Sequence, residues 1–162
     1  MPEPEATINS SDIESLPRIC GSWVEVLPDL VRRDSNRALA SSIEAFAMSI
    51  LCRGPTRNAP ISVGLEAYDK ALSSVNDALR CPYDSFPVEI AAAVMCLLLA
   101  ELFLATSLDS WTAHQQGLGK LMQLSRPEFY ASGIPHRLFV GARPALVRSR
   151  CLSSCEAVGV SG

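Results

Sequence analysis

The stretch from Ser85 to Pro127 decides the fold of this chain, and it opens with Ser85-Phe-Pro-Val-Glu-Ile90. Ser85 can cap a helix by accepting a hydrogen bond from a free backbone amide. Pro87 suits the first turn, because the N–H that proline lacks would have no partner there. The sequence is then apolar without interruption from Ile90 to Ala100. Apolar residues thus cover nearly the whole circumference, which is typical of a helix surrounded by neighbours. We expect a buried central helix.

A membrane span is the competing interpretation of this stretch, because about 20 apolar residues are needed to cross a bilayer. The uninterrupted run is shorter, and Glu89 and Glu101 interrupt the wider segment. No cluster of Lys or Arg flanks it to set an orientation. The sequence therefore favours a core helix over a membrane helix.

Length and composition limit the function classes. The 162 residues are enough for one domain, which at that size buries roughly 68–70% of the surface of the unfolded chain. A net charge of −3 argues against nucleic-acid binding by the chain as a whole. The start, Met1-Pro-Glu-Pro-Glu5, lacks the basic residues and apolar run of a secretory signal. We therefore expect an intracellular protein with reduced thiols.

Apolar residues recur at helical spacing in two segments before the central helix. The first set is Leu39, Ile43, Phe46, Ala47, Ile50 and Leu51, and the second is Leu65, Tyr68, Leu72, Val75 and Leu79. Both sets are predicted to face the core. Earlier in the chain, Trp23, Leu27 and Leu30 are expected to dock on the core from short helical turns.

Two further helical segments are predicted after the central helix, from Trp111 to Leu124 and from Pro135 to Arg150. No segment alternates apolar and polar residues as a strand would. The prediction is an all-α fold, an irregular helical bundle or array around a buried central helix, with no sheet. Residues 1–16 are predicted to be a mobile acidic arm, and residues 151–162 an irregular tail.

Several short motifs follow one another along the chain. They are Trp23 with Leu27-Pro28, Tyr68-Asp-Lys-Ala-Leu72, Leu99-Ala-Glu101-Leu, Trp111-Thr-Ala-His114-Gln-Gln-Gly117, Arg126-Pro127 and Leu138-Phe139. In order and spacing they resemble the fungal-specific transcription factor domain, the middle homology region found downstream of a binuclear zinc cluster in fungal regulators. The resemblance extends from about Trp23 to Arg150, and it implies that residues 17–150 are part of such a regulatory domain.

Two features depart from that family. Its zinc cluster needs six closely spaced cysteines, whereas here the nearest pair, Cys151 and Cys155, has no other cysteine close by. We therefore expect no sequence-specific DNA binding and no metal or other cofactor. The family domain also continues well beyond the matched segment, so we expect a truncated copy.

The resemblance implies a nuclear role in transcriptional regulation, exerted through contacts with other regulatory proteins or with the missing remainder of the domain. A small-molecule effector is known for parts of the family. The alternative hypothesis is a free-standing helical interaction or small-molecule-binding module, and the third is a cysteine-based enzyme. We expect no enzyme, because Cys96 lies in the most apolar run, where burial raises a thiol pKa, and no catalytic fingerprint is present.

The candidate site residues are Glu101, Trp111, His114 and Tyr68. A carboxylate within an apolar helix must be paired, hydrogen bonded or protonated. We expect a structural role, in which Glu101 joins helices through the Trp111 indole N–H or through His114. A working acid at Glu101, and a ligand or base at His114, are the alternatives. Tyr68 and Trp111 are candidates for lining a pocket beside the central helix.

Two smaller features complete the sequence-based expectations. A local basic excess is formed by Arg137, Arg143, Arg148 and Arg150, which we interpret as a solvated helix face and not as a nucleic-acid patch. Gly117 and Gly119 are expected to allow close approach of a neighbouring backbone.

Overall fold

The computed structural model describes residues 23–33, 37–53, 58–80 and 88–156, and the side chains up to residue 147. The elements, in order, are η1 (Trp23–Val26), α2 (Leu27–Arg33), α3 (Ala38–Arg53), α4 (Ile61–Leu79), α5 (Val88–Leu104), α6 (Leu108–Met122), η2 (Pro127–Tyr130) and α7 (Gly133–Glu156). All are helical, and these residues contain no strand. The predicted all-α fold is confirmed. The expected arm at residues 1–16 and the expected cap Ser85 lie outside the described residues.

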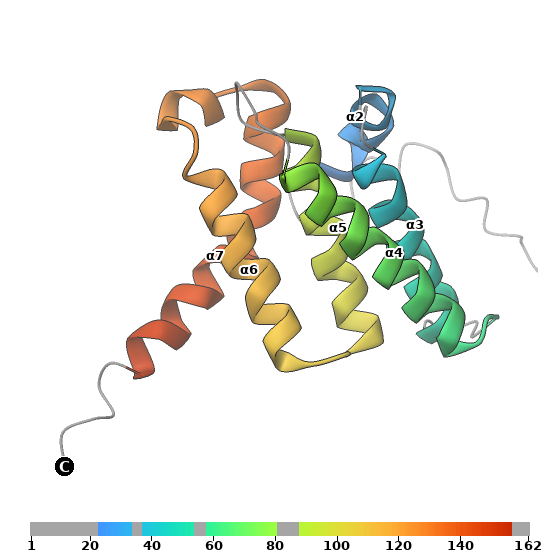
Figure 1. The fold of residues 1–162 in the computed structure, drawn as a ribbon. Coiled ribbons are helices and arrows are strands. Elements are labelled where there is room, and N and C mark those ends of the chain that lie inside the picture. Colours follow the sequence, from blue (N-terminus) through green and yellow to red (C-terminus); the bar gives the residue numbers. More distant parts are fainter. Residues whose placement is uncertain (1–22, 34–36, 54–57, 81–87, 157–162) are drawn as a thin grey trace, which may run out of the picture.

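The helix α5 forms the centre of the structure, as the apolar run predicts. It lies between α6 and the pair formed by α3 and α4 (Figure 1), and it also contacts α2 and α7. Its buried residues are Ile90 to Leu98, Ala100, Glu101 and Leu104, and of its side chains only Leu102 is largely exposed. Because neighbours cover almost its whole circumference, an uninterrupted apolar sequence is stable here in water.

The helices α3 and α4 pack through small residues. The buried residues of α3 are Ala38, Leu39, Ser41, Ser42, Ala45, Ser49 and Cys52, and those of α4 are Gly64, Tyr68, Ala71, Val75 and Ala78. Both sets have the spacing of one helix face. The predicted faces were therefore wrong in part. Leu39, Tyr68 and Val75 are buried as predicted, whereas Leu51, Leu65 and Leu79 are 39%, 38% and 44% exposed and small residues take the remaining buried positions.

Buried serines are compatible with this contact because their own helix satisfies them. The Ser42 hydroxyl donates to the Ala38 carbonyl at 2.9 Å, and the Ser49 hydroxyl donates to the Phe46 carbonyl at 2.6 Å. A hydroxyl that is bonded in this way needs no partner on the facing helix. Serine therefore acts as a small core residue in α3.

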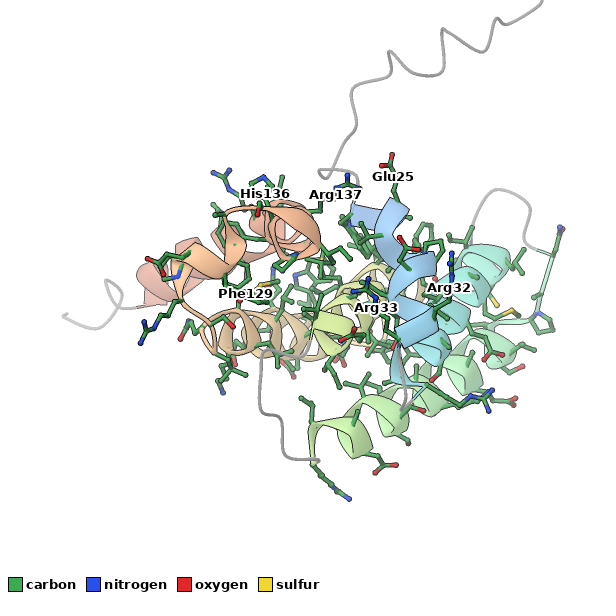
Figure 2. The ribbon with its side chains drawn as sticks, turned by 90° about the horizontal axis from the view of Figure 1, so that it is seen from above. Glu25, Arg32, Arg33, Phe129, His136 and Arg137 are labelled. Carbon is green, nitrogen blue, oxygen red and sulfur yellow. The ribbon has the colours of Figure 1, made fainter. Side chains whose placement is uncertain are left out.

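The first turns and the last helix close the structure on one side. Trp23, Leu27 and Leu30 are buried against the core, as predicted. Figure 2 shows Glu25 of η1 and Arg137 of α7 side by side, and their charged groups are 4.0 Å apart. This contact joins the first described element to the last.

The helix α7 is longer than predicted. It runs from Gly133 to Glu156, so its backbone stays helical for six residues of the stretch 151–162 that was expected to be irregular. The reason is that residues 151–156 contain no Gly or Pro, and adding residues to an existing helix is much easier than starting one. Pro144 lies inside α7, where proline removes a backbone hydrogen bond, and the helix bends part-way along (Figure 1).

The packing predicts opposite effects for two glycine substitutions. A Cβ added at Gly64 would lie 3.0 Å from the Cys52 Sγ and 3.1 Å from the Leu104 Cδ2, and both side chains are buried. Gly64→Ala should therefore lower the free energy of unfolding by about 1 kcal/mol. A Cβ added at Gly117 would meet nothing within 4 Å, so Gly117→Ala should raise it by about 0.5–1 kcal/mol. Urea denaturation measures both, and equal stabilisation by the two variants would contradict the close packing at Gly64.

Candidate functional site

Three of the four candidate residues meet where α4, α5 and α6 come together. The Tyr68 hydroxyl of α4 lies 2.5 Å from the His114 Nε2 of α6, and the two rings meet edge to face with centroids 6.0 Å apart. Glu101 of α5 belongs to the same cluster, because its carboxyl interacts with both Tyr68 and His114. Tyr68 and Glu101 are each only 3% exposed. One buried polar cluster thus connects three helices.

The Glu101 carboxylate also fixes the connection from α5 to α6. Its Oε1 accepts hydrogen bonds from the Thr106 hydroxyl at 2.7 Å and from the Ser107 backbone N–H at 3.1 Å. The chain can turn back towards Glu101 because Ala105 adopts a φ of +48°, a left-handed conformation that costs a non-glycine residue about 1–2 kcal/mol. Ser107 in turn caps α6 by accepting from the Ser110 N–H at 3.0 Å.

The pKa values of the three groups follow from their surroundings. Burial acts to raise the pKa of Glu101, but hydrogen bonds from Thr106, Ser107 and Tyr68 outweigh it and bring the pKa below its ordinary value. Burial lowers the pKa of His114, against the opposing effect of the Glu101 charge. Burial, and then the hydrogen bond with Glu101, raise the pKa of Tyr68. At neutral pH the cluster therefore contains a carboxylate, a neutral imidazole and a protonated phenol.

The single proton of the Tyr68 hydroxyl determines how the cluster is bonded. The Glu101 Oε2 is buried and has no partner at full hydrogen-bonding geometry, and Tyr68 is the neighbour that interacts with this carboxyl. If Tyr68 donates to Glu101, its oxygen remains free to accept from a His114 Nε2–H. We infer this arrangement because it gives Glu101, Tyr68 and His114 each a hydrogen-bond partner. If Tyr68 donated to His114 instead, the Oε2 of the carboxylate would have no donor.

Of the two roles expected for Trp111, a hydrogen bond to Glu101 and the lining of a pocket, the structure has the second. Its indole N–H forms no hydrogen bond with Glu101 in the described part of the chain. Instead, Trp111 lines a hollow of about 610 Å³, which we call the α5–α6 hollow. Its lining residues are Glu101, Leu102, Ala105, Ser107, Leu108, Trp111 and Thr112. The structure therefore divides the candidates into a buried cluster of Tyr68, Glu101 and His114 and an outer surface that contains Trp111.

Sequence reasoning missed Thr106 and Ser107, which are the direct hydrogen-bond partners of Glu101. The available signal was the segment Ser107-Leu-Asp-Ser110, in which a serine precedes a helix and can cap it. A polar turn that follows directly on a helix ending with a buried acid is a natural source of donors for that acid.

The remaining chemical groups offer little reactivity. Burial raises the pKa of the Cys96 thiol to about 12, so this cysteine stays protonated and inaccessible. Cys81, the other cysteine near the central helix, lies outside the described residues. The described residues contain no group of three or more His, Cys, Asp or Glu side chains placed to hold a metal ion.

The expected glycine and arginine features differ in outcome. Gly117 mediates no close approach, because a Cβ there would meet nothing within 4 Å, and at Gly119 it would only touch the Leu146 Cδ2 at an ordinary 3.6 Å. The expected close approach of a neighbouring backbone at these two glycines was therefore wrong.

The arginines of α7 behave as expected of a solvated helix face. Arg137 pairs with the acidic Glu25, and Arg143 is exposed. The side chains of Arg148 and Arg150 lie outside the described part.

Comparison of the chain with family models, with curated proteins and with solved structures gives no match. The resemblance to the fungal-specific transcription factor domain therefore rests on the sequence motifs alone. Within the described residues, no helix combines the length and the apolar character that crossing a membrane requires.

Replacing the charge at Glu101 should destabilise the fold at neutral pH. Glu101→Gln keeps an acceptor for Thr106 but removes the carboxylate, so the free energy of unfolding at pH 7 should fall by about 1–2 kcal/mol. Because the pKa of Glu101 is lowered on folding, the wild-type advantage is present above the unfolded pKa of about 4.3 and is lost as the pH falls further. Urea denaturation at pH 7 and pH 3 measures this difference.

The control is Glu89→Gln, at the opposite end of the same helix. Glu89 forms none of these hydrogen bonds, so its substitution should change stability by less than about 0.5 kcal/mol. Equal effects of the two substitutions at pH 7 would show that the Glu101 carboxylate has no special role.

His114 should produce a second pH-dependent change. Its pKa is lowered on folding, so the unfolded chain takes up a proton more readily, and stability should fall as the pH drops from the unfolded value of about 6.5 towards 5. His114→Gln cannot be protonated, and its stability should change less over this range. Chemical denaturation at intervals of half a pH unit tests the prediction, and an unchanged slope in the variant would contradict it.

Proposed function

We propose that this chain is part of a helical regulatory domain that acts in transcription through protein contacts, as its resemblance to the fungal-specific transcription factor domain implies. On this proposal it works in the nucleus, has no DNA-binding zinc cluster of its own, and contacts other regulatory proteins or the remainder of the domain. The all-α architecture around a buried central helix is compatible with that resemblance.

The observation that carries the proposal is the apolar surface around the α5–α6 hollow. Leu102 and Leu108 are 60% and 87% exposed, and both line the hollow together with Trp111. Large apolar side chains that gather around a concave surface are typical of protein contact sites. Glu101 gives this surface a defined shape, because its hydrogen bonds to Thr106 and Ser107 hold the turn that carries Leu108.

A small-molecule-binding module is the second candidate. It is favoured by the hollow itself, which Glu101 and Trp111 line together. A volume of about 610 Å³ lies within the range of small-molecule sites, roughly 300–1,000 Å³. A ligand here would place an aromatic or aliphatic group against Trp111 and Leu108. The third hypothesis, a cysteine-based enzyme, has little support because Cys96 is protonated and buried.

A transcription reporter tests the regulatory proposal. The chain fused to an unrelated DNA-binding domain should change reporter transcription, whereas the chain alone should not. Replacing both Leu102 and Leu108 with Ser should remove at least half of the effect of the fusion, because the exposed apolar contact is lost.

The matched control is Leu79→Ser, which changes an exposed leucine at the end of α4, away from the hollow. It should leave the reporter signal of the fusion unchanged. Circular dichroism of each variant checks that the helices remain. A fusion that leaves transcription unaffected would count against regulation, and equal losses in both sets of variants would count against this surface.

A further inference from the structure

A second concave surface lies between α6 and α7, and we call it the α6–α7 groove. It has a volume of about 520 Å³, within the range of small-molecule sites. Gln115, Gln116, Gly119, Lys120 and Met122 come from α6, Gln123 from its C-cap, and Phe139, Arg143, Leu146 and Val147 from α7. None of these residues belongs to the cluster of Tyr68, Glu101 and His114 or to the α5–α6 hollow.

Gln115, which lines this groove, carries an unsatisfied hydrogen-bond acceptor. The side chain is 1% exposed, and its Nε2 donates to the Ala145 carbonyl of α7 at 2.9 Å. A carbonyl can only accept, so this bond fixes the orientation of the amide and directs its oxygen elsewhere. The Gln115 Oε1 is buried and has no partner in the described residues. Such an acceptor is unfavourable unless a donor reaches it.

The other residues that line the groove indicate which further chemical groups a ligand would have. Met122, Phe139 and Leu146 provide an apolar wall. Lys120 and Arg143 are exposed cations, and no acidic residue is among those that line the groove. Among the described residues neither cation has an acidic partner, and an apolar wall beside such positive charges favours an amphipathic anion.

We propose that the α6–α7 groove binds a small amphipathic anion that carries a hydroxyl or N–H donor. The donor bonds to the Gln115 Oε1, the apolar body lies against Phe139 and Leu146, and the anionic group lies towards Lys120 and Arg143. This site is independent of the proposed contact surface at Leu102 and Leu108, so either can fail without the other.

Two matched probes test the donor, namely 6-hydroxynaphthalene-2-sulfonate and naphthalene-2-sulfonate, which differ only in the hydroxyl. Titration calorimetry with the wild-type chain should give a roughly three- to tenfold lower dissociation constant for the hydroxylated probe. This ratio corresponds to the free energy of one net hydrogen bond. Gln115→Met, which keeps the size and removes the acceptor, should bind both probes equally. Equal affinities in the wild type, or no binding of either probe at millimolar concentration, would overturn the proposal.

Position 119 tests the place of binding, with position 117 as its control on the same helix. Gly119→Leu puts a side chain into the groove and should lower the affinity for both probes at least tenfold. Gly117→Leu points into open space outside the groove and should leave both affinities within about twofold. Equal weakening by the two variants would place the probes elsewhere and overturn the proposal. The comparison of the two probes on the wild-type chain needs no variant. It therefore tests the contribution of the ligand hydroxyl even if a variant fails to fold.

Discussion

The hydrogen bonds to the buried carboxylate of Glu101 are the interaction on which most of this structure depends. The carboxylate lies near the end of the central helix, joins the Tyr68 hydroxyl on one side and receives Thr106 and Ser107 on the other. Removing a charge from water is unfavourable by several kcal/mol unless such donors surround it. With these donors in place, the carboxylate links α4 to α5 and fixes the turn from which α6 begins. The same bonds define the hollow at which we place the proposed function.

A second constraint is the small size of the residues between α3 and α4. Gly64 and Cys52 lie so close that a single methyl group would not fit without movement. This close packing brings α4 near enough to the central helix for Tyr68 to reach His114, 46 residues further along the chain. The small-residue contact and the polar cluster therefore support each other, since the cluster needs a short distance between helices and the contact provides it.

The sequence was sufficient to predict the fold class, the central helix and the burial of Glu101. An unbroken apolar run from Ile90 to Ala100 leaves few alternatives, and an acid next to it must find partners. The identity of those partners could not be predicted. Thr106 and Ser107 reach the carboxylate only because Ala105 takes a left-handed conformation, and no apolar pattern signals that turn. The inward faces of α3 and α4 were predicted only in part. A pattern of large apolar residues finds Leu39, Tyr68 and Val75, but it misses the buried serine, alanine and glycine residues of the same helices.

The charge of Glu101 in the folded state can be observed directly. A pH titration of the chemical shift of its side-chain carboxyl carbon, with ¹³C-labelled glutamate, follows ionisation of this one group. A midpoint below the ordinary value of about 4.3 is expected, because donors from Thr106, Ser107 and Tyr68 stabilise the carboxylate more than burial destabilises it. A midpoint above that value would mean that burial dominates and the acid is not held by its neighbours, which would contradict the central role given to this side chain.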